Sequence, residues 1–111
     1  VIRHRNHIET WSAVPVSFNS DTVFYDFTTS ASKAFGNNLK QLSSDKYALY
    51  VGDVNQDGLV DGSDMSDTEA DNNNFVIGYV ITDVNGDGLV DGSDMSQVET
   101  ANNNFISLII P

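Results

Sequence analysis

The 111-residue sequence contains no cysteine, which excludes disulfides, thiolate metal sites and cysteine nucleophiles. It also has no apolar run near the ~20 residues that a membrane-spanning helix needs, so we expect no membrane insertion. No charged and apolar leader opens the chain, and its first residue is Val1. We therefore expect a mature piece or a fragment of a longer protein. A chain of this length forms one domain or two very small ones.

Basic residues are absent from the second half of the chain. Residues 51–111 hold 12 of the 16 acidic residues and none of the 5 Lys and Arg, which gives a charge of −12, whereas the first 50 residues carry +1. Such a segment repels itself, and it repels nucleic acid and anionic lipid as well. We therefore expect no nucleic-acid partner, and we expect a cation to neutralise the segment before it becomes compact.

The acidic half is an internal duplication with an offset of 30 residues. Residues 53–75 and 83–105 are identical at 18 of 23 positions, and the first twelve positions differ only at Gln56 and Gly86. Repeats of this length usually form units that need their twin to bury an apolar face.

Each repeat has the spacing of an EF-hand calcium loop, in which oxygen ligands stand at positions 1, 3, 5, 7, 9 and 12 and a glycine stands at position 6. Calcium prefers six to eight oxygen ligands, and alternate residues of a tight loop supply them. The predicted ligands of the two ions are Asp53, Asn55, Asp57, the Leu59 carbonyl, Asp61 and Asp64 in the first loop, and Asp83, Asn85, Asp87, the Leu89 carbonyl, Asp91 and Asp94 in the second.

Two alternatives compete with calcium. Asp, Asn and Gly also dominate ordinary surface turns, but two complete loops with an acid at position 12 argue against turns alone. Magnesium prefers fewer protein ligands and keeps its water.

The loops resemble those of the dockerin family over about residues 51–105. The resemblance is carried by the duplicated loop, by Asp rather than Glu at position 12, and by the Gly52-Asp53-Val54-Asn55 stretch that opens the first loop. It implies an extracellular bacterial module with two calcium ions and one helix after each loop, and no catalytic activity. It also implies attachment to a cohesin module, with recognition residues at loop positions 10 and 11, here Gly62-Ser63 and Gly92-Ser93.

Short helices are predicted after the loops, over residues 65–71 and 95–101, with Met65 and Met95 as their main apolar contacts. The Asn triplets that follow suit helix C-caps, because Asn tolerates the left-handed conformation. Leu59 and Leu89 would form an exposed apolar patch, and we expect both to fold under the N-terminal half.

The remaining β-branched and aromatic stretches predict strands. These stretches are residues 1–11, 14–18, 22–27, 47–51, 75–82 and 105–111, and a helical turn is predicted over residues 30–35. The uncharged last stretch must lie in this chain's sheet or in a neighbour's, since an exposed apolar strand aggregates. The aromatic residues expected in the core are Trp11, Phe18, Phe24, Tyr25, Phe27 and Phe35. The predicted fold is α+β: a small, antiparallel, β-rich region over residues 1–50, and a pair of calcium loops, each followed by a short helix, over residues 51–111.

His4 and His7 lie three residues apart, and on a strand this spacing places side chains on opposite faces. We interpret them as a strand surface, with a zinc or catalytic pair as the alternative. An aromatic platform that binds sugars is a further alternative to an aromatic core.

The sequence has no nucleophile elbow, phosphate loop or zinc motif, so we do not expect an enzyme. Our first hypothesis is an extracellular or cell-surface structural module, stabilised by two calcium ions, that joins copies of itself head-to-tail into a fibre by strand addition. The second is a docking module that attaches a secreted protein to a cohesin-like receptor.

Overall fold

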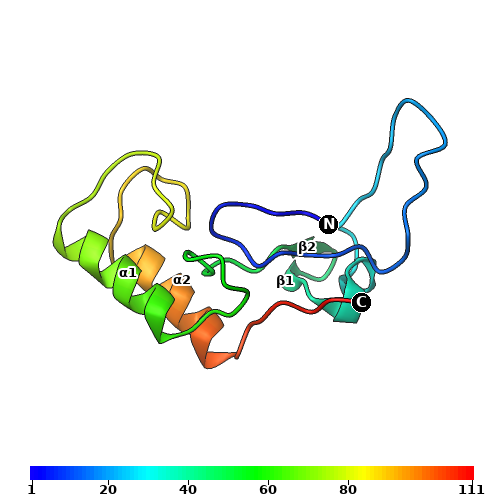
Figure 1. The fold of residues 1–111 in the computed structure, drawn as a ribbon. Coiled ribbons are helices and arrows are strands. Elements are labelled where there is room, and N and C mark those ends of the chain that lie inside the picture. Colours follow the sequence, from blue (N-terminus) through cyan, green and yellow to red (C-terminus); the bar gives the residue numbers. More distant parts are fainter.

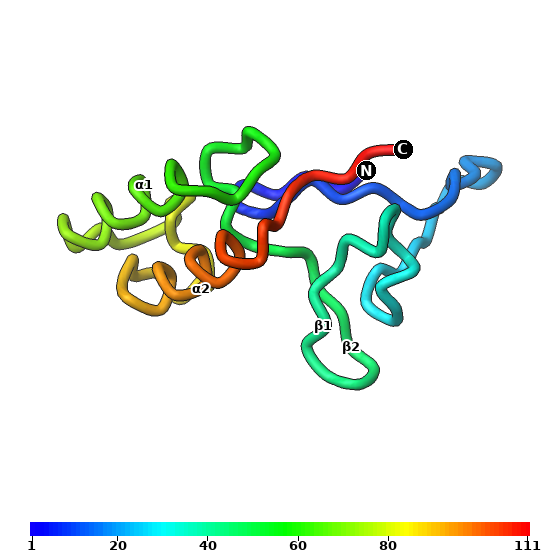
Figure 2. Tube along the Cα trace, turned by 90° about the horizontal axis from the view of Figure 1, so that it is seen from below, coloured from blue at the N-terminus to red at the C-terminus, as the bar shows by residue number.

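The computed structural model describes all of residues 1–111, as an elongated molecule of 48 × 29 × 27 Å. Two helices, α1 and α2, lie at one end of the long axis, and a small β-hairpin and both chain termini lie toward the other (Figures 1 and 2). No helix has the length and apolar character that a membrane crossing requires.

Helices α1 (Gly62–Asn73) and α2 (Gly92–Asn103) follow the two predicted calcium loops and run in opposite directions side by side (Figures 1 and 2). Each is 12 residues long, longer than predicted, and starts from a capping box. In α1 the Asp61 carboxylate accepts from the helix N-terminus, while Asp64 accepts from the Asp61 amide. Such reciprocal capping satisfies donors that the first turn leaves free. The last residues of each loop therefore also start its helix.

Both helices end in a Schellman motif with phenylalanine in the left-handed conformation. Phe75 has φ 52° and Phe105 has φ 54°, whereas the capping Asn74 and Asn104 have ordinary negative φ. The Val76 amide donates to the Asp71 carbonyl at 3.1 Å, which closes the first motif. The prediction that the asparagine triplets cap the helices is therefore confirmed, but the left-handed residue is the phenylalanine that follows each cap.

The chain contains far less strand than predicted. Its only sheet is the antiparallel hairpin of β1 (Lys40–Ser43) and β2 (Lys46–Ala48), with a bulge between Gln41 and Ser43. The predicted strands over residues 1–11, 47–51, 75–82 and 105–111 form only isolated bridges outside β2, and those over residues 14–18 and 22–27 form none. The predicted helical turn is present as two short 3-10 helices, η1 (Ala31–Lys33) and η2 (Phe35–Asn37). The fold is therefore mixed α+β, with two helices and one small antiparallel sheet.

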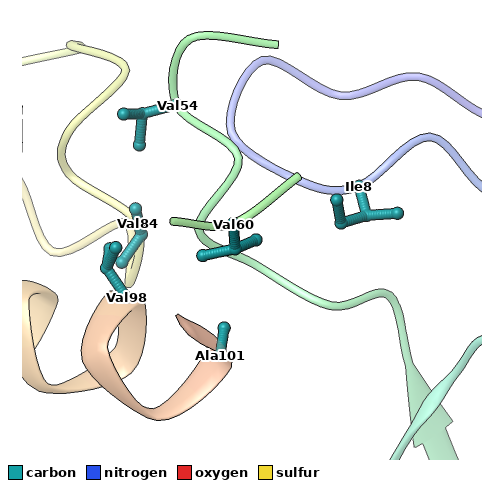
Figure 3. Packing of buried hydrophobic residues seen from close by; sticks show 6 residues of the cluster. All are labelled: Ile8, Val54, Val60, Val84, Val98 and Ala101. Carbon is teal, nitrogen blue, oxygen red and sulfur yellow. The ribbon is translucent and has the colours of Figure 1, made fainter. Parts of the chain in front are cut away.

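The core is small and aliphatic (Figure 3). It joins one N-terminal residue to residues of both loops and of α2, namely Ile8, Val54, Val60, Val84, Val98 and Ala101. Met65 is half-buried and packs against this core, as predicted for the first helix, whereas the buried apolar contacts of α2 are Val98 and Ala101 rather than Met95. None of the six aromatic residues predicted in the core is fully buried, and Phe18 and Phe24 are 82% and 85% exposed. Because Ile8 packs with residues of the second half, the two predicted regions share this core.

The segment after each helix pairs with the loop of the other repeat. The Val60 amide donates to the Ile106 carbonyl at 2.9 Å, and the Val90 amide donates to the Val76 carbonyl at 3.0 Å. These pairs form the isolated bridges of Leu59 with Ser107 and of Leu89 with Ile77. The leucines are not folded under the N-terminal half and remain 43% and 40% exposed, so that prediction was wrong.

The crossed pairing holds the C-terminal segment inside its own molecule. The Leu108 amide donates to the Gly58 carbonyl at 2.7 Å, and the Asn38 side chain donates to the Ser107 carbonyl at 3.0 Å. Ile109 covers Gly36, where an added Cβ would lie 2.6 Å from its Cγ2 atom. The segment therefore contacts its own chain but does not enter its sheet as predicted: it forms one isolated bridge, at Ser107, and Ile110 remains exposed.

Residues 14–27 form a long excursion that projects from the body of the molecule in Figure 1. No backbone–backbone hydrogen bond of the structure involves these residues. Together with residues 1–2, residues 11–13, Phe35 and Pro111, the excursion lines two open, largely apolar cavities of about 490 and 260 Å³.

Candidate metal centre

The first carboxylate of each predicted loop is buried and organises the loop around itself. Asp53 is 2% exposed, and its two oxygens accept from the amides of Asp57 and Gly58, both at 3.1 Å. Asp83 does the same with the amides of Asp87 at 3.2 Å and Gly88 at 2.9 Å. These contacts explain why position 6 is glycine, since Gly58 and Gly88 have φ 92° and 89°.

The carboxylate at position 12 closes each loop. Asp64 is fully buried, and one of its oxygens accepts from the amides of Val54 at 2.8 Å and Asn55 at 3.2 Å, while the other accepts from the Asp61 amide at 2.9 Å. Asp94 makes the equivalent three contacts at 2.9, 3.1 and 3.0 Å. A buried charge is tolerated only with partners of this kind.

The side chains at positions 3, 5 and 9 lie at the outer side of the loop. The side-chain Oδ1 of Asn55 accepts from the Asp57 amide at 2.9 Å, and the side-chain Oδ1 of Asp57 accepts from the Leu59 amide at 3.0 Å. Asp61 accepts from the Ser63 amide at 2.7 Å. Asn85, Asp87 and Asp91 repeat these contacts in the second loop.

The carbonyl at position 7 is the remaining predicted ligand of each loop. The carbonyl oxygens of Leu59 and Leu89 accept no backbone or side-chain hydrogen bond, although residues on either side of them are paired. Each loop therefore keeps one backbone oxygen free for another donor or for a cation.

Burial and crowding act against the ionised form of the first carboxylate. Burial raises the pKa of Asp53, and the nearby charges of Asp64 and Asp57 raise it further, while the hydrogen bond from Gly58 opposes the shift. The side chain and amide of Ser63 lower the pKa of Asp61, and those of Ser93 lower the pKa of Asp91. A divalent cation would relieve the repulsion that raises the pKa of Asp53.

All twelve predicted ligands therefore lie in two equivalent loops, but their side chains are turned toward the loops' own amides. No group of three or more His, Asp or Glu side chains is arranged so as to hold a metal ion. The donor set itself fits calcium, because each loop offers four carboxylates, one amide oxygen and one free carbonyl, all of them oxygen donors. The loops thus supply the oxygen donors that calcium requires, in the order of a calcium loop, but the donor side chains do not converge on one point.

The N-terminal segment holds both loops together, which sequence reasoning missed. The buried Asn6 side chain donates to the carbonyls of Ile81 at 3.1 Å and Asp83 at 3.0 Å. Gln56 donates to the His7 carbonyl at 3.1 Å. The one difference between the loop sequences, Gln56 against Gly86, could have indicated that only the first loop makes such a contact.

His4 and His7 lie together rather than on opposite faces. The His7 amide donates to the His4 carbonyl at 3.3 Å across a turn, and the two Nδ1 atoms are 2.8 Å apart. The expectation from strand spacing was therefore wrong, because residues 4–7 turn instead of extending.

No protein-family model matches the chain, and no similar curated protein or solved structure was found.

Proposed function

We propose that this protein is a non-catalytic, calcium-binding structural module of an extracellular or cell-surface assembly. Calcium stabilises its fold, and copies of the chain join head-to-tail by strand addition. The observation that carries the proposal is the pair of matching loops, each closed by a fully buried aspartate, within a segment of charge −12.

Electrostatics supports the role of calcium. Residues 51–111 contain no basic side chain, and the only ion pair of the molecule, between Arg3 and Glu9, lies outside them. Two calcium ions would reduce the charge of the whole chain from −11 to −7, because −11 + 4 = −7. Their binding energy would then become folding energy, as in other small domains that depend on a metal.

The excursion over residues 14–27 supports strand addition. This segment makes no backbone–backbone hydrogen bond, so most of its amides and carbonyls are available to a neighbouring strand, and it is rich in β-branched and aromatic residues. Phe18 and Phe24 expose large apolar surface here, which a neighbouring chain would cover. The C-terminal segment is the weaker candidate for this contact, because its backbone already pairs with the first loop.

The experiment is analytical ultracentrifugation and negative-stain microscopy of the chain in millimolar calcium. We expect polymers that are lost when Phe18 and Phe24 are both changed to Asp. The matched control is Phe75→Asp, which alters a phenylalanine of equal 82% exposure outside the excursion and should leave the polymers intact. A wild-type chain that stays monomeric at its highest soluble concentration would contradict assembly.

A dockerin-type docking module is the second candidate, supported by the two equivalent loop–helix units. Ser63 and Ser93, at the positions that the dockerin resemblance assigns to recognition, are exposed at the starts of α1 and α2. Capture of the calcium-loaded monomer by an immobilised cohesin, lost in a Ser63→Trp and Ser93→Trp double variant, would favour this role over assembly.

A further inference from the structure

A turn at the N-terminus brings three Lewis-basic atoms together outside the calcium loops. They are the Nδ1 atoms of His4 and His7 and the side-chain Oδ1 of Asn6. The two nitrogens are 2.8 Å apart, and the oxygen lies 3.1 Å from His4 Nδ1 and 2.9 Å from His7 Nδ1. These atoms form a nearly equilateral triangle.

The orientation of the amide is fixed by its other end. Asn6 is 1% exposed, and its Nδ2 donates to two carbonyls, those of Ile81 and Asp83. Carbonyl oxygens accept only, so this side of the amide must carry the nitrogen and the opposite side must present the oxygen. The buried asparagine therefore directs an acceptor toward the two imidazoles.

Protons alone satisfy this triangle poorly. A neutral imidazole with a proton on Nδ1 donates there, and one without it accepts. If only one of the two Nδ1 atoms carries a proton, the triangle has one hydrogen-bond donor. The lone pairs of the other nitrogen and of the Asn6 oxygen then still face each other across about 3 Å. With two protons, both N–H groups converge on one oxygen. A cation would interact favourably with all three atoms at once.

The dimensions match a metal ion bound to one face of an octahedron. With metal–ligand distances of about 2.1 Å and right angles, neighbouring ligand atoms are about 3.0 Å apart, close to the three observed edges. Two imidazoles that both aim at such an ion have ring centroids about 4.3–4.6 Å apart, whereas a head-on hydrogen bond between them needs about 5 Å. The observed separation of the centroids is 4.5 Å.

We propose that His4, Asn6 and His7 form a binding site for a divalent first-row transition metal that takes octahedral coordination, such as Ni²⁺, distinct from the two calcium loops. Imidazole ligands select such an ion over calcium, which prefers oxygen. The remaining coordination positions are filled by water.

The surroundings suit this role. The site opens into a cavity of about 610 Å³ that Asp83 and Asp87 also line, so a cation has both access and a favourable field. The Arg5 guanidinium lies over the Tyr79 ring, 3.5 Å from its centroid. Its charge opposes a second cation, and the acidic lining of the cavity offsets it.

The experiment is a calorimetric titration of Ni²⁺ into the full chain in millimolar calcium, so that the calcium loops are already saturated. We expect one ion per chain, and we expect the His4→Gln variant to bind at least about tenfold more weakly, because even the loss of an outer-shell partner costs that much. Ni²⁺ should also broaden the imidazole NMR signals of both histidines in the wild-type chain.

The control is Arg3→Gln, which changes the local charge without removing a donor atom and should keep the affinity within about twofold. His4 and Arg3 are both exposed, so neither substitution threatens the fold, which circular dichroism would verify. The proposal is overturned if the wild-type chain does not bind Ni²⁺ at about 1 mM. Equal affinities of wild type, His4→Gln and His7→Gln would overturn it too.

Discussion

The left-handed phenylalanines at the ends of α1 and α2 lead to a sharp prediction about stability. A side chain in this conformation costs about 1–2 kcal/mol, because its Cβ approaches the following carbonyl. Phe75 is 82% exposed and Phe105 is 85% exposed, so each buries less than a fifth of its surface. With about 200 Å² of side chain and ~25 cal/mol per Å², that burial contributes only about 1 kcal/mol. The phenylalanine therefore gains little from the position that it strains to occupy.

The test compares Phe75→Gly with Phe75→Ala, because both remove the ring and only glycine removes the strain. We expect the glycine variant to be about 1 kcal/mol more stable than the alanine variant, and close to the wild type. The measurement is urea unfolding in millimolar calcium, and thermal melts should differ by about 4 °C for a chain of this size. The same pair at Phe105 is an internal repeat of the experiment. An alanine variant as stable as the glycine variant at both sites would refute this reasoning.

Three further predictions rest on the same structure. Asp64→Ala should lower the free energy of unfolding by about 3 kcal/mol or more, because it leaves three backbone amides without the buried carboxylate that accepts from them. The control, Asp67→Ala at an exposed position, should change this free energy by less than about 0.5 kcal/mol. Chemical denaturation measures both variants. Gly36→Ala should lower the free energy of unfolding by more than about 1 kcal/mol in the same assay, because Gly36 has φ +66° and the Ile109 side chain would lie 2.6 Å from the new Cβ. Its control is Gly62→Ala, in open space on a helix, which should leave stability unchanged or raise it. The pKa of His7 falls from 6.5 to about 4 on folding, so as the pH falls the unfolded chain takes up a proton before the folded chain does. The neutral His7 ring therefore contributes its full share to the stability of the fold above pH 6.5, and this share is lost as the pH falls toward 4. After allowance for its partial exposure this amounts to about 1–2 kcal/mol, and the His7→Gln variant should lack this part of the pH dependence of stability.

The local parts of the fold could be predicted from the sequence. The positions of the helices follow from the loop spacing, because Asp61 and Asp91 both end a turn and cap a helix. The predicted helices are too short at both ends: residues 62–64 and 92–94 belong to the helices as well as to the loops, and the helices continue two residues past the predicted ends, to Asn73 and Asn103.

The long-range parts could not be predicted in the same way. The β-branched run over residues 75–82 has the composition of a strand, yet only Ile77 forms a bridge, because its partner is the tight loop of the other repeat. The contact of Asn6 with Asp83 spans 77 residues, and no local pattern indicates it. The exposed Phe18 and Phe24 were assigned to the core by composition, although the excursion that carries them folds back on no sheet.

The histidine pair shows the same limit at short range. A spacing of three separates two side chains on a strand, but it brings them together on a tight turn. The sequence His4-Arg5-Asn6-His7 contains no glycine or proline, and its one residue that favours turns, Asn6, does not mark a turn by itself. Its conformation follows instead from the burial of Asn6 against the second loop.

The most direct test of the calcium hypothesis is a calcium titration of metal-stripped protein, followed by calorimetry and far-ultraviolet circular dichroism on one sample. We predict two ions bound per chain and a gain of the helical signal of α1 and α2 as the loops fill. Full helical signal in excess chelator, together with no heat on calcium addition, would show that the acidic repeats fold without the ions.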